Sequence, residues 1–306
     1  MIVKSFRQTL YKNRILLLML VPAMLHIIVF SYLPMGGIIL AFKRFQYQSG
    51  IFQSPWVGLE NFNYFFVSGQ AWEVTRNTVL YNLAFIIIIP AIQILLAIIL
   101  SELGGKYFKK ITQSVMFLPF FISWVIVGSI AYNVFNFEYG LLNNILTMFG
   151  AEPVNMYGEP GAWKYLILFF KLWKELGYGM IIYLAAIVSI DKEMYEAGKM
   201  DGANIFQRIR YIMIPQIMPM VMIMFLLQVG QIFRGDFGLF YQLIGNNGAL
   251  LAQTDIIDTF VFRSLLHSSE VGMAAAAGLY QSVMCFITIM LVNYIVKRVK
   301  SDYALF

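Results

Sequence analysis

The chain has 306 residues, of which 60% are hydrophobic and only 12% are charged, and its formal net charge is +6. Soluble domains carry about 25% charged residues, so this composition excludes an ordinary soluble protein and favours a membrane protein. The positive charge does not indicate a nucleic-acid partner, because the basic residues cluster beside the apolar segments. The single cysteine, Cys285, and the two histidines, His26 and His267, are too few and too scattered for a disulfide framework or a metal site.

The apolar segments are long and continuous, and a bilayer core takes about 20 residues of helix. Five segments are clear candidates for membrane-spanning helices. A sixth carries Lys171, Lys174 and Glu175 in its outer half, but its second half is apolar enough to insert. We therefore predict an all-α, polytopic membrane protein with six transmembrane helices in one domain over residues 1–306. The predicted spans are 15–33, 79–100, 114–135, 163–188, 215–233 and 272–296.

The basic residues predict the orientation of these spans. The apolar stretch from Ile15 is too long for a signal peptide and lacks a small-residue cleavage pattern, so we expect it to be retained as the first span. With the N-terminus inside, the cytoplasmic segments hold 14 basic residues and the outer loops hold five. This asymmetry is what the positive-inside rule requires, so both termini are expected in the cytoplasm.

The segment between the fourth and fifth spans differs from the rest of the chain. Residues 191–210 contain four acids and four bases, so the segment is expected to be wet and uncharged overall. We predict a short helix over 193–200 that ends at Asp201-Gly202, because glycine permits the left-handed conformation that stops a helix. A second helix is predicted from Asn204 toward Ile212, with Pro215 opening the next span. On these grounds alone the segment is either an amphipathic connector on the inner membrane surface or a docking element.

The segment from Glu196 to Pro215 resembles the cytoplasmic coupling loop of ABC importer permeases. The pattern of that family is Glu-Ala-Ala, three residues, Gly, nine residues and Ile-x-Leu-Pro, and its spacing fits throughout. Two positions depart, since Gly198 replaces alanine and Ile214 replaces leucine. The resemblance implies a coupling loop over 191–214 that docks into an ATPase subunit. Its docking residues would be Glu196, Ala197, Gly198, Asp201, Gly202, Ala203, Ile212 and Pro215.

Other segments are similar to the branch of carbohydrate permeases that imports oligosaccharides and polysaccharide fragments, including aldouronate-type sugars. They include Leu-Val-Pro-Ala at 20–23, Trp-Val-Gly-Leu-Glu-Asn-Phe at 56–62 and Phe-Leu-Pro-Phe-Phe-Ile-Ser-Trp at 117–124. The resemblance implies a bacterial cytoplasmic membrane protein that works by alternating access. Its expected partners are a second homologous permease, two ATPase subunits and an extracellular sugar-binding lipoprotein, with no nucleic acid. ATP and Mg would be bound by the ATPase subunits, while this chain would have no cofactor and no catalytic residue.

Polar residues at membrane depth are the candidates for a sugar path, because ionisable groups inside a span usually face a bundle interior or a cavity. Lys171 and Glu175 are four residues apart, so they share a helix face and can pair. The alternatives are a structural ion pair, or a lysine that extends to the outer interface. The predicted path residues are Lys171, Trp173, Glu175, Tyr178, Gln228 and Gln231. Further polar or aromatic residues within the spans are Asn82, Gln93, Trp124, Asn133, Gln281 and Asn293.

Three alternatives fit the composition but lack supporting features. An ATP-driven motor within this chain would need a P-loop, and Gly105-Lys106 lacks the glycine and the hydroxyl residue that complete one. An intramembrane enzyme would need a metal-binding or nucleophile motif, which the sequence does not contain. An ion-coupled secondary transporter usually has more spans in two related halves. Asp255 and Asp258 are interpreted as local structure, and His26 as a hydrogen-bonded interior residue.

Overall fold

The computed structural model describes residues 12–266 and 269–299. Every regular element in these ranges is a helix, and one isolated bridge pairs Lys43 with Trp56. The prediction of an all-α fold is therefore confirmed. Of the residues named above, His267 lies outside the described residues, as do some of the basic residues counted at the two termini.

Four helical segments in the described part of the chain are long and apolar enough to cross a membrane. The number rises to six when each of two sharply bent helix pairs is counted as one span. The four segments are Arg14–Phe42, Gln70–Glu102, Ile205–Val229 and Val271–Arg298. The bent pairs are Lys106–Phe121 with Trp124–Phe135, at 92°, and Pro160–Val188 with Lys192–Met200, at 69°.

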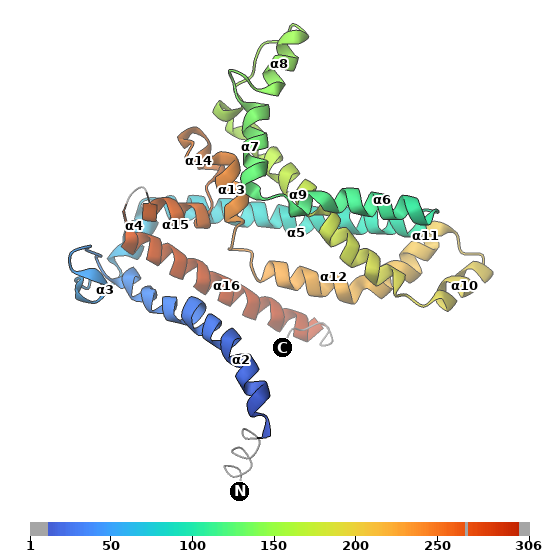
Figure 1. Cartoon of the computed structure of the whole chain (residues 1–306), viewed down its shortest axis with the longest axis horizontal. Coiled ribbons are helices and arrows are strands. Elements are labelled where there is room, and N and C mark those ends of the chain that lie inside the picture. The colour runs from blue at the N-terminus through green and yellow to red at the C-terminus, as the bar shows by residue number, and fades with distance from the viewer. Residues whose placement is uncertain (1–11, 267–268, 300–306) are drawn as a thin grey trace.

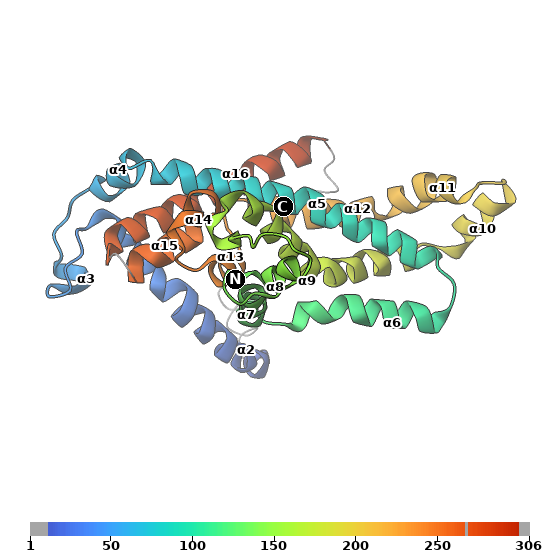
Figure 2. The same cartoon turned by 90° about the horizontal axis from the view of Figure 1, so that it is seen from above.

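The N-terminal half of the first helix protrudes from the rest of the molecule (Figures 1 and 2). It comprises α2 (Arg14–Ile27), the π-helical η1 (Ile28–Tyr32) and the 3₁₀-helical η2 (Leu33–Phe42), and no described residue of α2 is buried. The prediction for His26 is therefore wrong: its side chain is exposed, and its ring lies 4.9 Å from that of Phe30. The apolar α2 buries no residue and so needs lipid or another protein around it, whereas η2 packs against α16 (Val271–Val299) and buries Ala41.

The segment after this helix is folded rather than loose. It holds the short helices α3 (Gly50–Gln53) and α4 (Glu60–Val67). Lys43 is buried between them, where its ammonium group donates to the carbonyl oxygens of Ile51, at 3.1 Å, and Phe52, at 2.7 Å. A buried ammonium group needs such partners because desolvation is costly.

The helix α5 (Gln70–Glu102) has 33 residues, which gives it a length of about 50 Å. It is longer than the predicted span 79–100 and longer than a bilayer core of about 30 Å. Its first turns bury Ala71 and Val74 against α4, α15 (Ile257–Leu266) and α16 (Val271–Val299). These turns extend the helix beyond the predicted span and hold the short helices in place.

The predicted span 114–135 is not one helix. α6 (Lys106–Phe117) continues into the 3₁₀ turn η3 (Leu118–Phe121), and α7 (Trp124–Phe135) then leaves at 92°. Ile122 and Ser123 are extended between them, and Ser123 caps α7 by accepting from the backbone N–H of Ile126 at 3.4 Å.

Lys174 of α9 (Pro160–Val188) stabilises this break. A helix end leaves backbone carbonyls without partners, and the Lys174 ammonium group donates to those of Phe120, at 2.7 Å, and Ile122, at 2.6 Å. It also lies 5.3 Å from the ring of Trp124. One lysine from a distant helix therefore bonds the backbone carbonyls that the break leaves without partners.

The central helix of the molecule is α9, which packs along α5. Its first half contributes Trp163, Ile167 and Phe170 to a core shared with α7, α13 (Phe237–Ile244) and α14 (Gly248–Thr254). Its second half contributes Met180 and Tyr183 to a core shared with the end of α5 and the start of α12 (Ile214–Val229). The remaining described helices are α8 (Leu141–Met148), η4 (Met156–Gly158), α10 (Lys192–Met200), α11 (Ile205–Arg208) and η5 (Ile209–Met213).

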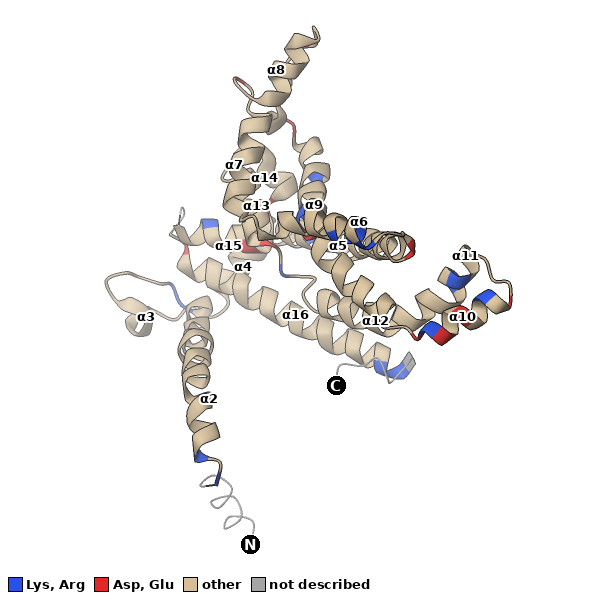
Figure 3. Cartoon of the chain, turned by 45° about the vertical axis from the view of Figure 1, so that its right-hand side comes forward, with Lys and Arg blue, Asp and Glu red and all other residues tan. Residues whose placement is uncertain are grey.

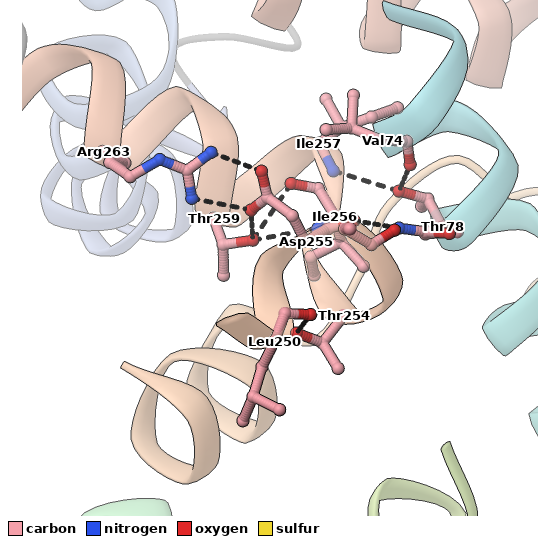
Figure 4. Close-up of polar contacts among 11 residues, drawn as sticks. Val74, Thr78, Leu250, Thr254, Asp255, Ile256, Ile257, Thr259 and Arg263 are labelled. Atoms are coloured by element: carbon pink, nitrogen blue, oxygen red, sulfur yellow. Dashed lines mark hydrogen bonds and ion pairs between the residues drawn. The ribbon is translucent and has the colours of Figure 1, made fainter. Parts of the chain in front are cut away.

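A hydrogen-bonded network fixes the turn between α14 and α15 (Figure 4). Arg263 pairs with both carboxylate oxygens of Asp255, which is 5% exposed, and Thr259 donates to the same carboxylate at 2.7 Å. Thr78 of α5 accepts from the backbone N–H of Ile257 at 3.0 Å. Asp255 therefore has a local structural role, as interpreted from the sequence.

Asp258 faces a different set of groups. One of its carboxylate oxygens accepts from the backbone N–H of Gly235 at 2.7 Å and from the Gln281 amide at 2.8 Å. Burial raises the pKa of Asp258, and these two hydrogen bonds act against that shift. Asp255 thus fixes the turn between α14 and α15, while Asp258 joins α15 to Gly235 and Gln281.

Charge is concentrated at a few places in the molecule (Figure 3). The helices α10 and α11 lie at one end of the long axis and carry acids and bases, while α3 and α4 lie at the other end (Figures 1 and 2). Basic residues also mark the first residues of α2 and the last residues of α16. The apolar lengths of α12 and α16 between these places are suited to lipid.

Candidate functional site

The predicted coupling loop, 191–214, is a helical hairpin at one end of the molecule (Figure 1). Its first helix, α10, begins where the Asp191 side chain accepts from the backbone N–H of Glu193 at 3.0 Å. This acidic N-cap satisfies one of the N–H groups that every helix start leaves free. The helix matches the predicted range of 193–200 closely.

The stop at the end of α10 follows the residue pattern predicted from Gly202. Gly202 is left-handed, with φ of 75°, and its N–H donates to the carbonyl of Lys199 at 3.0 Å. The N–H of Ala203 donates to the carbonyl of Gly198 at 2.9 Å. These two bonds form a Schellman motif, which reverses the chain without leaving the last carbonyls unpaired.

The second helix of the hairpin starts at a capping box. The Asn204 side chain accepts from the N–H of Gln207 at 3.0 Å, and the Gln207 side chain accepts from the N–H of Asn204 at 2.8 Å. As predicted, Pro215 lies in the first turn of the next span, α12, although the helix runs into it without a stop from Ile205 to Val229. Proline lacks an N–H, and the five-residue π turn η5 just before Pro215 accommodates the missing bond.

One ion pair joins the hairpin to the end of α5. Arg208 lies 3.4 Å from a carboxylate oxygen of Glu102, and both side chains are mostly buried. The hydroxyl of Tyr195 is also buried there without a hydrogen-bond partner among the described residues. Burial and the charge of Glu102 raise the pKa of Tyr195. The hairpin is thus joined to α5 by a polar contact and continues directly into α12.

The outer surface of the hairpin is exposed and partly apolar. Met200 is 88% exposed, Phe206 79% and Tyr211 70%. Exposed apolar side chains that gather in one place mark interaction sites. Of the predicted docking residues, the exposed ones are Glu196, Ala197, Asp201, Gly202 and Pro215, and the half-buried ones are Gly198, Ala203 and Ile212.

A cavity of about 370 Å³ lies between α5, η3, α9 and α12. Five of the six predicted path residues line it: Lys171, Glu175, Tyr178, Gln228 and Gln231. Trp173 does not, because its half-buried ring points to the core cluster around Trp163. The structure therefore gathers two predicted segments, 171–178 and 228–231, around one space.

Lys171 pairs with both acidic residues that line the cavity. Its ammonium group lies 2.5 Å from a carboxylate oxygen of Glu175 and 2.8 Å from one of Asp236. The predicted pairing of Lys171 with Glu175 is thus present, and Asp236 is an unexpected third member. Asp236 also caps α13 by accepting from the N–H of Leu239 at 3.1 Å, so the network ties α9 to α13.

Two amides fix the walls of the same cavity. Gln93 donates to the backbone carbonyl of Glu175 at 2.9 Å, and it fits closely because Gly179 has no side chain. Asn82 donates to the carbonyl of Ile232 at 2.8 Å and so holds the segment after α12. These amides are structural in this state, although both face the cavity.

Three polar side chains of the lining remain available to a ligand. The amides of Gln228 and Gln231 make no hydrogen bond with another described residue. Arg234 is exposed and forms no ion pair within the described part of the chain. Sequence reasoning missed Arg234 and Asp236, because neither lies within an apolar span or at helical spacing from a charged partner.

The comparisons with known proteins agree with this arrangement. Residues 93–301 match the family described as binding-protein-dependent transport system inner membrane component. The chain is 32% identical to Protein LplB of Bacillus subtilis (strain 168), over 96% of this chain and 92% of the relative. It is 33% identical to the polygalacturonan/rhamnogalacturonan transport system permease protein YteP of the same organism, over 94% and 89%.

Solved structures show the same similarity in three dimensions. One is a bacterial ABC transporter involved in the import of the acidic polysaccharide alginate, with a TM-score of 0.86, 29% identity and coverage of 97% of this chain and 99% of that chain. Another is a bacterial alginate ABC transporter in complex with an alginate pentasaccharide-bound periplasmic protein, with a TM-score of 0.85 and 28% identity, covering 95% of this chain and 97% of that chain. Like these relatives, the chain is a transport component and not an enzyme. It belongs to the family of inner membrane components of binding-protein-dependent transport systems.

Proposed function

We propose that this chain is the permease subunit of a bacterial ABC importer that carries oligosaccharides or polysaccharide fragments inward. The observation that carries the proposal is the hairpin over 191–214, which places exposed acids and apolar side chains at one end of the molecule while its second helix continues into α12. A rigid connection of this kind suits the transfer of motion from an attached motor to the spans.

The motor is a separate pair of ATPase subunits, which bind ATP and Mg. Each would hold one hairpin, with Glu196 and Asp201 facing basic groups and Met200 and Phe206 entering an apolar groove. Charged and apolar contacts side by side are typical of protein interfaces. Both termini of this chain would lie on the same cytoplasmic side, as the basic residues at the ends of α2 and α16 favour.

The cargo follows from the cavity and from the names of the relatives. Free amides at Gln228 and Gln231 can bond sugar hydroxyls, and Tyr178, which is 45% exposed, offers a ring face. Arg234 adds a cation that can pair with a uronate carboxylate. YteP is named for polygalacturonan and rhamnogalacturonan, and the solved structures for alginate. We therefore propose acidic oligosaccharides as the first class to test.

The complete importer would contain a second homologous permease that closes the path, and an extracellular binding protein that delivers the sugar. ATP binding closes the ATPases, draws the hairpins together and opens the path outward, and hydrolysis resets it. The ATP-bound and hydrolysed ATPases must hold the hairpin in different positions to shift the path between its two states. A rigid joint between the hairpin and α12 would pass that difference on to the span.

The hairpin assignment is tested by purifying the complex from its native membrane and identifying a co-purifying P-loop ATPase by mass spectrometry. Glu196→Lys should remove that ATPase from the complex, because it reverses a charge on the exposed face. Lys192→Glu, a charge reversal at the start of the same helix, should retain it. Retention of the ATPase by both variants would contradict docking through this face.

The cargo assignment is tested by uptake into proteoliposomes that hold the complete importer and its binding protein. The panel contains oligogalacturonides, alginate oligosaccharides and neutral malto-oligosaccharides. Arg234→Gln should raise the KM for the acidic sugars and leave neutral uptake unchanged. Equal effects on both classes would contradict a carboxylate contact at Arg234. The variants Gln228→Ala and Gln231→Ala should lower uptake of every transported sugar, and unchanged uptake would remove them from the path.

A further inference from the structure

A second and larger cavity, of about 730 Å³, lies away from the central one, between α7, the segment 136–139, η4 and the end of α13. Its frame is tight. The backbone of α7 approaches that of α13 so closely at Gly128 that an added Cβ would lie 2.4 Å from the carbonyl oxygen of Gln242. Asn136 holds the adjoining turn by accepting from the N–H groups of Glu138, at 2.9 Å, and Tyr139, at 3.1 Å. The cavity is therefore a built feature of the fold.

Aromatic rings form one wall of this cavity. The ring of Tyr132 lies 6.2 Å from that of Tyr139 and 5.9 Å from that of Tyr157. Tyr132 is 48% exposed and Tyr139 is 53% exposed, so both rings offer a face to a ligand. Tyrosine combines an apolar ring with a polar hydroxyl, which suits a molecule that has both C–H faces and hydroxyl groups.

The lining of this cavity is also rich in amides. Gln242 makes no side-chain hydrogen bond with another described residue, and the amide nitrogens of Asn136 and Asn155 are likewise not used by the bonds that their oxygens accept. Glu138 carries the only charge among the described lining residues. Free amides and tyrosines with little charge match a ligand that is dense in hydroxyl groups.

One helix joins this cavity to the central one. Asp236 at the start of α13 lines the central cavity of about 370 Å³. Gln242 and Gly245 at its end line the second cavity, which is the outer cavity. The eight residues of α13 are about 12 Å long. A molecule must therefore be longer than about 12 Å to contact both cavities.

From this arrangement we infer that the outer cavity is a second carbohydrate subsite, which holds the trailing units of an oligosaccharide whose leading units occupy the central cavity. Tyr132 and Tyr139 would stack against the sugar rings, and Gln242 would bond their hydroxyls. The inference rests on the proposed function, because it takes sugars to be the cargo. It adds that this chain binds long oligosaccharides more tightly than short ones.

The test is uptake as a function of substrate length in proteoliposomes that hold the complete importer. Oligogalacturonide, alginate and malto-oligosaccharide ladders are supplied, each from the disaccharide upward. The double variant Tyr132→Ala/Tyr139→Ala should raise the KM for the long members of a transported ladder roughly tenfold, and leave the disaccharide unchanged. Tyr139→Phe keeps the ring and should keep most of the affinity. Tyr47→Ala, at a 71% exposed tyrosine outside the cavity, is the matched control.

Each remaining outcome is decisive. A loss of uptake that is equal for all lengths, or a lower yield of assembled complex, would overturn the subsite and assign the two tyrosines to assembly. Unchanged uptake of long members would overturn it as well. Absence of uptake of every ladder by the unmodified importer would overturn the sugar assignment itself, which is a distinguishable result. Gln242→Leu offers an independent check, since it should affect long members alone.

Discussion

The hairpin over 191–214 and the cap formed by α13, α14 and α15 are both built from short helices, but they are stabilised in opposite ways. In the hairpin, Gly202 and Asn204 make bonds to residues no more than four positions away, and both residues are exposed. In the cap, Leu239, Leu250 and Ile256 are completely buried against α5, α7 and α9.

The difference indicates how each region can move. A hairpin held by local bonds keeps its shape when it shifts as a unit, because few of its contacts join it to the rest of the described chain. The cap cannot shift without breaking a packed core, whose interior tolerates little displacement. We expect the hairpin to be a moving part and the cap to be a fixed part, and four variants test that contrast.

The largest effect is expected in the cap. Arg263→Ala leaves the carboxylate of Asp255 buried without its ion-pair partner, which should destabilise the protein by about 3 kcal/mol or more. The measurement is the thermal unfolding midpoint of the protein in nanodiscs. Arg44→Ala, which breaks an exposed ion pair with Glu60, is the control and should change the midpoint little. Equal shifts of the midpoint for both variants would mean that the buried ion pair of the cap contributes no more to stability than the exposed pair.

Gly202→Val should have the next largest effect, on coupling rather than on folding. Gly202 has φ of 75°, and a β-branched side chain in this conformation costs roughly 1–2 kcal/mol. The turn should deform, so that ATP hydrolysis continues while uptake is lost. Gly150→Val is the control, because Gly150 has the same φ and open space around it. Normal transport by Gly202→Val would count against the proposed geometry.

Asn204→Ala should have a smaller effect of the same kind. It removes the side-chain acceptor of the capping box and should cost about 1 kcal/mol of helix stability. The measurement is hydrogen exchange of the backbone amides in α11, together with the ratio of ATP hydrolysed to sugar transported. Asn204→Asp keeps an acceptor at the cap and should restore both. A variant without faster exchange would show that the cap is not needed once the helix continues into α12.

Gly198→Ala should have the smallest effect. An added Cβ would lie 2.8 Å from Cδ1 of Ile212, the flexible end of a side chain that can move away. Alanine favours the helix by up to about 1 kcal/mol relative to glycine, and this gain offsets the closer contact. Uptake should stay within about twofold of the unmodified importer. A strong loss would mean that the close approach of α10 to Ile212 is required for coupling.

Much of this protein could be predicted from its sequence because the relevant interactions are local. Apolar length alone indicates helices in a membrane. Gly202 and Asn204 predict the hairpin turn, since a left-handed glycine and a side-chain cap act within a few residues. The pairing of Lys171 with Glu175 follows from their spacing on one helix face. The docking role of the hairpin and the sugar contacts remain predictions.

Only the tertiary structure decided which residues meet across the chain. The break at Ile122 depends on Lys174, some fifty residues away, and the ion pair of Lys171 gains Asp236 from another helix. Trp173 faces the core instead of the cavity because Trp163 and its neighbours pack there. A single sequence specifies bonds between near neighbours, whereas contacts between distant helices depend on how all the side chains pack together. That is why most of the helices could be predicted from the sequence, while the break at Ile122 and the shapes of the two cavities could not.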